Sequence, residues 1–110
     1  MLNRIEVAGV LVERQAPRFT PAGVPVVEGV LRHQSEQLEA GSPRRVDCEV
    51  RLIALAAAAQ LLQAAKPGVE LVLGGFLAAR SRHGRQLQMH VTKIEFVEGK
   101  QDGKVLQEEG

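Results

Sequence analysis

Hydrophobic and polar residues alternate along most of the chain, with the period of two that is typical of β-strands with one buried face. The alternation predicts five strands, at residues 3–13, 26–33, 46–53, 69–80 and 87–96. In the last strand the apolar residues lie at odd positions up to Val91 and at even positions from Ile94, a change that one β-bulge would produce. The first strand has apolar residues on both faces, and a second apolar face of this kind often meets another subunit.

The segments between these strands differ in composition. Residues 55–65 are almost all Ala, Leu and Gln and are followed by a Lys-Pro-Gly sequence, so one short helix is expected here. Residues 17–25 contain prolines and a glycine that interrupt strand pairing, which predicts a loop. Residues 34–45 are polar without a periodic apolar face and are predicted to form a mobile loop. Residues 81–86 turn around a His-Gly pair, which predicts a hairpin.

Three strands, one helix and two further strands follow one another in the order of the oligonucleotide-binding (OB) barrel. We therefore predict an all-β fold with one short helix, arranged as a five-stranded antiparallel OB-fold barrel. This single domain is expected to span residues 1–97. Residues 98–110 are polar and charged, with only Val105 and Leu106 to bury, so a disordered tail is expected there.

Composition narrows the class of protein. A chain of 110 residues with 45% hydrophobic residues can build one core. The single Cys48 excludes an internal disulfide, and its place on an apolar phase predicts burial. Cys and His spacing matches no metal site, and no acidic pair has a histidine beside it, so we expect no metal, no cofactor and no enzymatic activity. No signal peptide or membrane-length apolar stretch is found, which favours a cytoplasmic protein without membrane contact.

Charge is unevenly distributed although the formal net charge is only +1. Residues 98–110 contain four acidic and two basic residues, a net −2, so the preceding 97 residues carry a net +3. Within that part, residues 80–85 hold three arginines and one histidine with no acid, and Arg44 and Arg45 form a second basic spot. Local positive loops on a near-neutral body favour a modest, salt-sensitive grip on phosphates.

Several short sequences are distinctive in combination. They are Asn3-Arg4, Gly9, residues 19–25, residues 31–35, residues 39–41, Cys48, Gly75-Phe76 and Ile94-Glu95. Through them the chain from Met1 to about Val97 resembles bacterial primosomal replication protein N, the PriB family. The resemblance implies a homodimer that binds single-stranded DNA without sequence preference, works with the restart helicase PriA and other primosome proteins, and catalyses no reaction.

The first candidates for DNA binding lie on the turn between the last two strands. A guanidinium group can hold a phosphate in a bidentate fork, and no acid lies among these residues, which are Arg80, Arg82, His83 and Arg85. The alternative to DNA binding is that these residues form a solvated hairpin tip whose positive charge serves only solubility.

Further candidates lie on the other loops and on outward strand positions. Arg18, Arg44 and Arg45 extend the basic path, and the resembling family is basic at the positions of Arg18 and Arg44. For these three a solvated loop is the alternative. Arg51 and His90 fall on the polar phases of their strands, where a cross-strand pair with a neighbour such as Glu49 is the alternative.

Aromatic residues for base stacking are few, since the chain has three Phe and no Trp or Tyr. Phe19 is the one expected to be exposed, whereas Phe76 and Phe96 are expected in the core. The resembling family often carries aromatic residues where this chain has Ser42 and Asp47. Two other functions therefore stay open: a protein-interaction OB adaptor with little DNA binding, and an RNA-binding OB module.

Overall fold

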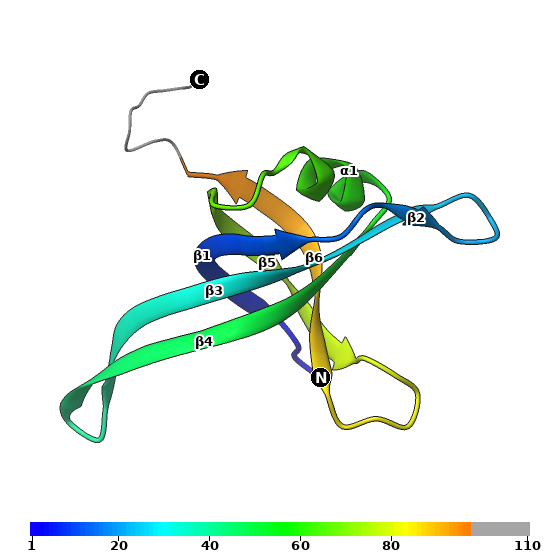
Figure 1. Cartoon of the computed structure of the whole chain (residues 1–110). Helices are drawn as coiled ribbons and strands as arrows, with labels where there is room; N and C mark the ends of the chain where they lie inside the picture. Colours follow the sequence, from blue (N-terminus) through cyan, green and yellow to red (C-terminus); the bar gives the residue numbers. More distant parts are fainter. Residues whose placement is uncertain (98–110) are drawn as a thin grey trace.

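The protein folds as one barrel of strands with a short helix at one end (Figure 1). A computed structural model of the chain describes residues 1–97, and the predicted tail lies outside the described residues. The elements are β1 (Ile5–Arg14), β2 (Arg18–Phe19), β3 (Pro25–Glu39), β4 (Ser42–Leu55), α1 (Ala57–Ala64), β5 (Glu70–Ala79) and β6 (Leu87–Phe96). No helix within residues 1–97 is long and apolar enough to cross a membrane.

Pairing between the strands closes the sheet on itself. The strands neighbour one another in the order β1-β5-β6-β4-β3, and β1 pairs back onto β3, while the two-residue β2 lies at the edge of β3. Each pairing is antiparallel except that of β4 with β6, which is parallel around Ile53 and His90. The predicted five-stranded OB barrel is confirmed, although its pairing is not antiparallel throughout.

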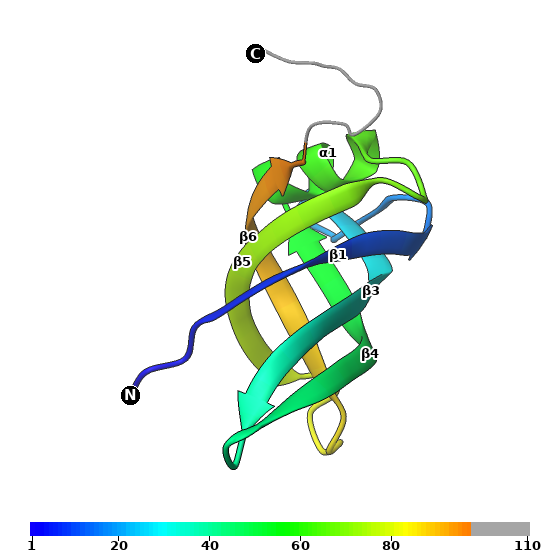
Figure 2. The ribbon, with the colours of Figure 1, turned by 90° about the vertical axis from the view of Figure 1, so that its left-hand side faces the viewer.

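The core fills the inside of the barrel with the side chains of alternate strand positions. They belong to Leu11, Val27, Leu31, Leu52, Leu71, Leu73, Met89 and Val91. The predicted helix is present as α1, and it covers one end of the barrel by burying Ala59 and Leu62 against this core (Figure 2). Alternation in the sequence therefore encodes the burial that stabilises the barrel.

Gly75 and Gly9 lie where strands approach too closely for a side chain. A Cβ atom on Gly75 would overlap the carbonyl oxygen of His90, and one on Gly9 would overlap that of Arg32. The register shifts beside Gly75, because Gly74 pairs with Lys93 and Gly75 with Val91. The predicted bulge is therefore confirmed, and it leaves one extra residue in β6 where the sheet bends.

The prediction of a mobile loop at residues 34–45 is wrong. β3 and β4 pair without interruption as far as Glu39 and Ser42, and the chain reverses at Ala40 and Gly41 with φ of 51° and 80°. Positive φ at both turn positions is the geometry of a tight hairpin. The hairpin, residues 33–48, forms an arm that extends beyond the barrel (Figure 1). Both faces of the arm meet solvent, and its sequence therefore shows no apolar alternation.

Three predictions of burial are also wrong. Cys48 is exposed because it lies on the arm, beyond the part of β4 that covers the core. Phe76 is 39% exposed, because Leu77 takes the inward position of β5 and Phe76 points outward. Phe96 is 43% exposed at the end of β6.

Candidate nucleic-acid interface

The loop between β5 and β6 projects from the end of the barrel opposite α1 (Figure 2). The Arg80 N–H donates to the carbonyl oxygen of Gln86 at 2.8 Å and closes the loop, and the Gly84 N–H donates to that of Ser81 at 3.2 Å. Arg80, Arg82, His83 and Arg85 are all exposed. Within residues 1–97, none of the three arginines forms an ion pair. We call residues 80–86 the arginine loop.

A hollow of about 470 Å³ lies between the arginine loop and β2. Arg80, Ser81, Gly84 and Gln86 line it from the loop, and the outer faces of β3, β4 and β6 contribute Glu28, Ile53 and Gln88. The hollow therefore opens on the outer face of β3 and β4, between the arginine loop and the segment that contains β2. OB folds bind oligonucleotides on this face, between two loops.

Arg18 lines the same hollow, but it is not a free loop cation. It lies on β2, paired with Val26 of β3, and its Nη1 donates to Glu28 Oε2 at 2.7 Å. Gln88 Nε2 donates to the other oxygen of Glu28 at 3.2 Å. Glu28 therefore orients Arg18 over the hollow and offsets part of its charge. Phe19 follows on β2 and is 66% exposed, as predicted.

The arm carries two of the predicted cations. Arg44 Nε lies 3.2 Å from Glu39 Oε1 in an exposed ion pair, and such pairs contribute little to stability. Arg45 is exposed and forms no ion pair in the described part of the chain. Arg51 is exposed on β4, and the alternative of a pair with Glu49 is not found among residues 1–97.

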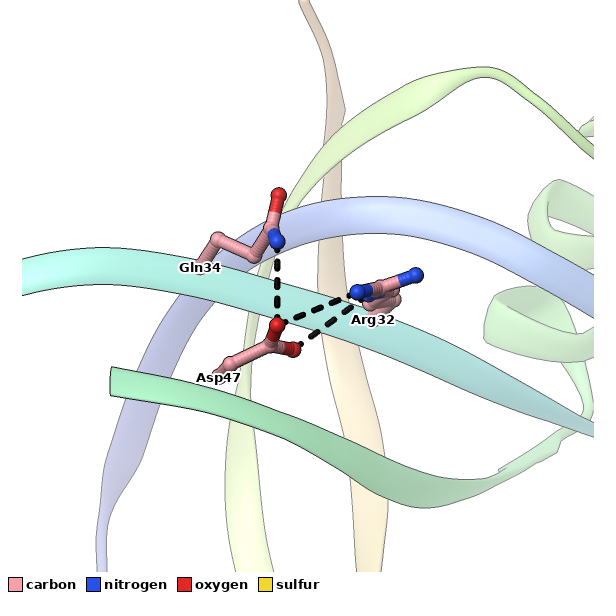
Figure 3. A network of polar contacts seen from close by, with 3 residues as sticks. All are labelled: Arg32, Gln34 and Asp47. Carbon is pink, nitrogen blue, oxygen red and sulfur yellow. Dashed lines mark hydrogen bonds and ion pairs between the residues drawn. The ribbon is translucent and has the colours of Figure 1, made fainter. Parts of the chain in front are cut away.

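A polar network that the sequence analysis missed connects β3 and β4 at the base of the arm (Figure 3). Arg32 donates to both carboxylate oxygens of Asp47, with Nε–Oδ1 and Nη2–Oδ2 distances of 3.3 and 3.0 Å. Gln34 Nε2 donates to Asp47 Oδ2 at 3.1 Å. Hydrogen bonds from Arg32, and then from Gln34, lower the pKa of Asp47, and the pair raises that of Arg32.

The pH dependence of this network follows from the lowered pKa of Asp47. Its stabilising contribution is present above the ordinary value of 3.8 and is lost only as pH falls through the lower folded-state value. We expect an NMR titration of the Asp47 carboxyl carbon to give a midpoint below 3.8. In the variant Arg32→Ala the midpoint should rise back toward 3.8, and an unchanged midpoint would show that Arg32 does not set the pKa of Asp47.

His90 was predicted to face outward from β6, and in the structure its ring stacks on that of Phe76. The ring centroids lie 4.9 Å apart and the planes meet at 9°. The two residues are cross-strand neighbours on β5 and β6. Met89 is buried and Leu77 contacts the core. Their neighbours along the chain, His90 and Phe76, therefore point outward.

Comparison with known proteins agrees with this geometry. Residues 3–93 match a family described as another single-strand binding protein family. The replication restart protein PriB of Bordetella pertussis is 36% identical over 98 residues, which cover 89% of this chain and 92% of the relative. The chain belongs to the PriB family. The PriB protein of Nitrosomonas europaea is likewise 36% identical over 89 residues, which cover 81% of this chain and 82% of the relative.

Solved structures share the fold of this chain. PriB from Ralstonia solanacearum superposes with a TM-score of 0.80 at 32% identity, covering 88% of this chain and 100% of that one. A Plasmodium falciparum single-strand binding protein in complex with single-stranded DNA superposes with a TM-score of 0.72 at 14% identity, covering 89% of this chain and 96% of that one. The second likeness shows the shared fold alone.

Proposed function

We propose that this protein binds single-stranded DNA in the restart of replication. The name of its relatives states replication restart, and the matching family is described as a single-strand binding protein family. The observation that carries the proposal is the arginine loop. Its three arginines are exposed, and Arg80 lines a hollow on the outer face of the barrel. A guanidinium group donates two parallel hydrogen bonds to a phosphate, and it stays charged at all relevant pH values.

The proposed strand follows the basic residues across β3 and β4. It starts on the arm at Arg45, which shares a face of β4 with Arg51, and reaches the hollow between Arg18 and the arginine loop. Arg44, the preceding residue, points to the opposite face of the arm. The residues assigned to phosphate contact are Arg18, Arg44, Arg45, Arg51, Arg80, Arg82 and Arg85, with His83 and His90 as weaker polar contacts. Phe19 is assigned to base stacking at the rim.

A fluorescence anisotropy titration tests this function. Labelled single-stranded DNA is titrated with the full chain at low and at high salt, with unlabelled duplex DNA and RNA as competitors. We expect the protein to retain the strand at low salt and to lose it steeply as salt rises, because phosphate contacts release counterions. Preferential displacement by RNA would favour the RNA-binding module instead.

We propose that the protein acts by binding and bridging, in the cytoplasm, without catalysis and without a cofactor. Its partners in this role are single-stranded DNA and the restart helicase PriA, with other primosome proteins.

A second candidate function is a protein-interaction adaptor with little DNA binding. It is favoured by Asp47, whose carboxylate lies on the proposed path of the strand. Retention of PriA on a protein that fails to bind any single strand would support this second function.

We also propose that the functional unit is a homodimer that forms along β1. Residues 5–9 of β1 pair with β5 on one side. On the other side β3 pairs only with β1 residues from Val10 onward. Val10 and Val12 on the same strand are exposed. His33 Nδ1 lies 2.7 Å from the carbonyl oxygen of Ala8, but no strand pairs with this side of residues 5–9 in the described part of the chain. A strand edge of this kind next to exposed apolar side chains is a template for pairing with a second copy. We expect light scattering at micromolar concentration to give twice the mass of one chain, and the mass of one chain would contradict the dimer.

A further inference from the structure

The stacked rings of Phe76 and His90 lie on the outer face of the barrel, where they contribute nothing to its core. Phe76 is 39% exposed, although a phenyl ring next to a barrel interior is normally buried. Both rings stand on paired strands rather than on a loop, so their position is fixed. An exposed planar ring held in this way is suited to stack against another planar ring.

Beside Phe76 lies a hollow of about 390 Å³. Its floor includes Gly74, where an added Cβ would meet only the Lys93 side chain, at 3.5 Å. Arg4 and Lys93 line it, with Glu6 as the one acidic residue. Asn3 fixes the N-terminal rim, because its side-chain amide donates to and accepts from the Leu77 backbone at 2.8 and 3.0 Å.

The hollow continues the proposed path of the strand. Ile53 lines both the hollow beside the arginine loop and an apolar one next to His90 and Phe76, and Phe76 in turn lines the hollow over Gly74. The surface is therefore continuous from the arginine loop to Gly74. A strand whose phosphates are held by the loop can extend over the two rings.

The chemistry of this hollow matches a nucleotide. A phenyl ring offers a face for a base, two cations exceed the single carboxylate of Glu6, and that carboxylate accepts a hydrogen bond from a base N–H group. A protein partner would instead favour a wide, contiguous apolar patch. Here the apolar hollow borders the ring on one side only, and Arg4, Glu6 and Lys93 border it on the other.

We propose that Phe76, supported by His90, is a stacking platform for one unpaired base, whose phosphate meets Arg4 and Lys93. The proposal rests on the proposed function, since it adds a base subsite to the single-stranded DNA path. It also accounts for base contact in a chain without Trp or Tyr.

Two variants and two strands test the platform. Phe76→Leu keeps an apolar side chain but removes the ring, and Gly74→Val adds a branched side chain to the floor, at a position where a Cβ atom meets only the Lys93 side chain. Each is titrated with an oligothymidine strand and with a strand of equal length made of abasic sites. We expect each variant to bind the oligothymidine about tenfold more weakly than the wild type, because one stacked base is lost. Affinity for the abasic strand should stay the same.

Controls separate the platform from general effects. Phe96→Leu alters an equally exposed phenylalanine away from the hollow and should change neither affinity, and Phe76→Tyr should bind as the wild type does. An unchanged affinity of Phe76→Leu for oligothymidine, or an equal loss on both strands, overturns the platform while leaving DNA binding intact. A changed assembly mass of Phe76→Leu with unchanged affinity overturns it in favour of a protein interface. If the wild-type protein retains neither strand, the proposed function itself fails and the platform fails with it.

Discussion

Replacing Arg80, Arg82 and Arg85 together with alanine is expected to weaken single-stranded DNA binding about 100-fold at low salt. Each side chain offers one charge-assisted phosphate contact, of about 1 kcal/mol at an exposed site. The slope of log affinity against log salt should also fall by about 2, since each phosphate contact on a single strand contributes roughly 0.7. Anisotropy titrations at several salt concentrations measure both quantities.

A matched control removes one cation elsewhere. Lys66 is exposed just after α1, at the end of the barrel opposite the arginine loop (Figure 2). The single variant Arg82→Ala is compared with Lys66→Ala, which changes the net charge by the same amount but should leave affinity and salt slope nearly unchanged. Because the loop side chains are exposed, the triple variant should unfold at the same urea concentration as the wild type. A triple variant with the affinity and slope of the wild type would show that the loop is only a solvated tip.

Replacing Gly75 with alanine is expected to destabilise the fold by about 3 kcal/mol or more, since the added carbon has no room. It would overlap the carbonyl oxygen of His90, and that carbonyl belongs to the strand that pairs with β5 at the bulge. Relief requires the two backbones to separate, which breaks the ladder that closes the barrel. Urea denaturation followed by circular dichroism measures the loss.

The adjacent glycine provides the comparison. A Cβ on Gly74 would lie 3.5 Å from the Lys93 side chain, an ordinary contact. Gly74→Ala should therefore be neutral, or stabilise by up to about 1 kcal/mol through the lower entropy of the unfolded chain. Equal effects at the two positions would mean that the strands do not approach each other as closely as the structure has them.

The barrel itself was predictable because its strands bury one face. Alternation located the residues that fill the core, such as Leu31, Leu52 and Met89, and the Ala-rich segment located α1. The order of these elements then indicated the OB fold. The slipped phase after Val91 even revealed the bulge, since a bulge changes which residues face inward.

The arm and the polar network at its base could not be predicted from one sequence. A strand pair with solvent on both faces has no apolar period, so residues 34–45 gave the same pattern as a loop. The contact of Arg32 with Asp47 depends on the register between β3 and β4, which such a pattern leaves open.

The site was only partly predictable. Exposure of the arginine loop followed from its composition, but the pairing of Arg18 with Glu28 required the short strand β2. Phe76 was expected in the core because hydrophobicity outweighed its position, although the outward phase of β5 already contained it. Exposed aromatic residues that bind ligands conflict with the burial rule, so sequence reasoning tends to place them inside.

The most direct measurement is an NMR titration of the uniformly labelled protein with unlabelled single-stranded DNA at low salt. If guanidinium groups on the loop between β5 and β6 hold the strand, the largest shift changes will fall on residues 80–86 and continue to Arg18 and Arg51, and added salt will reverse them. Shift changes that avoid those residues, or a spectrum that the DNA leaves unaltered, would contradict the account.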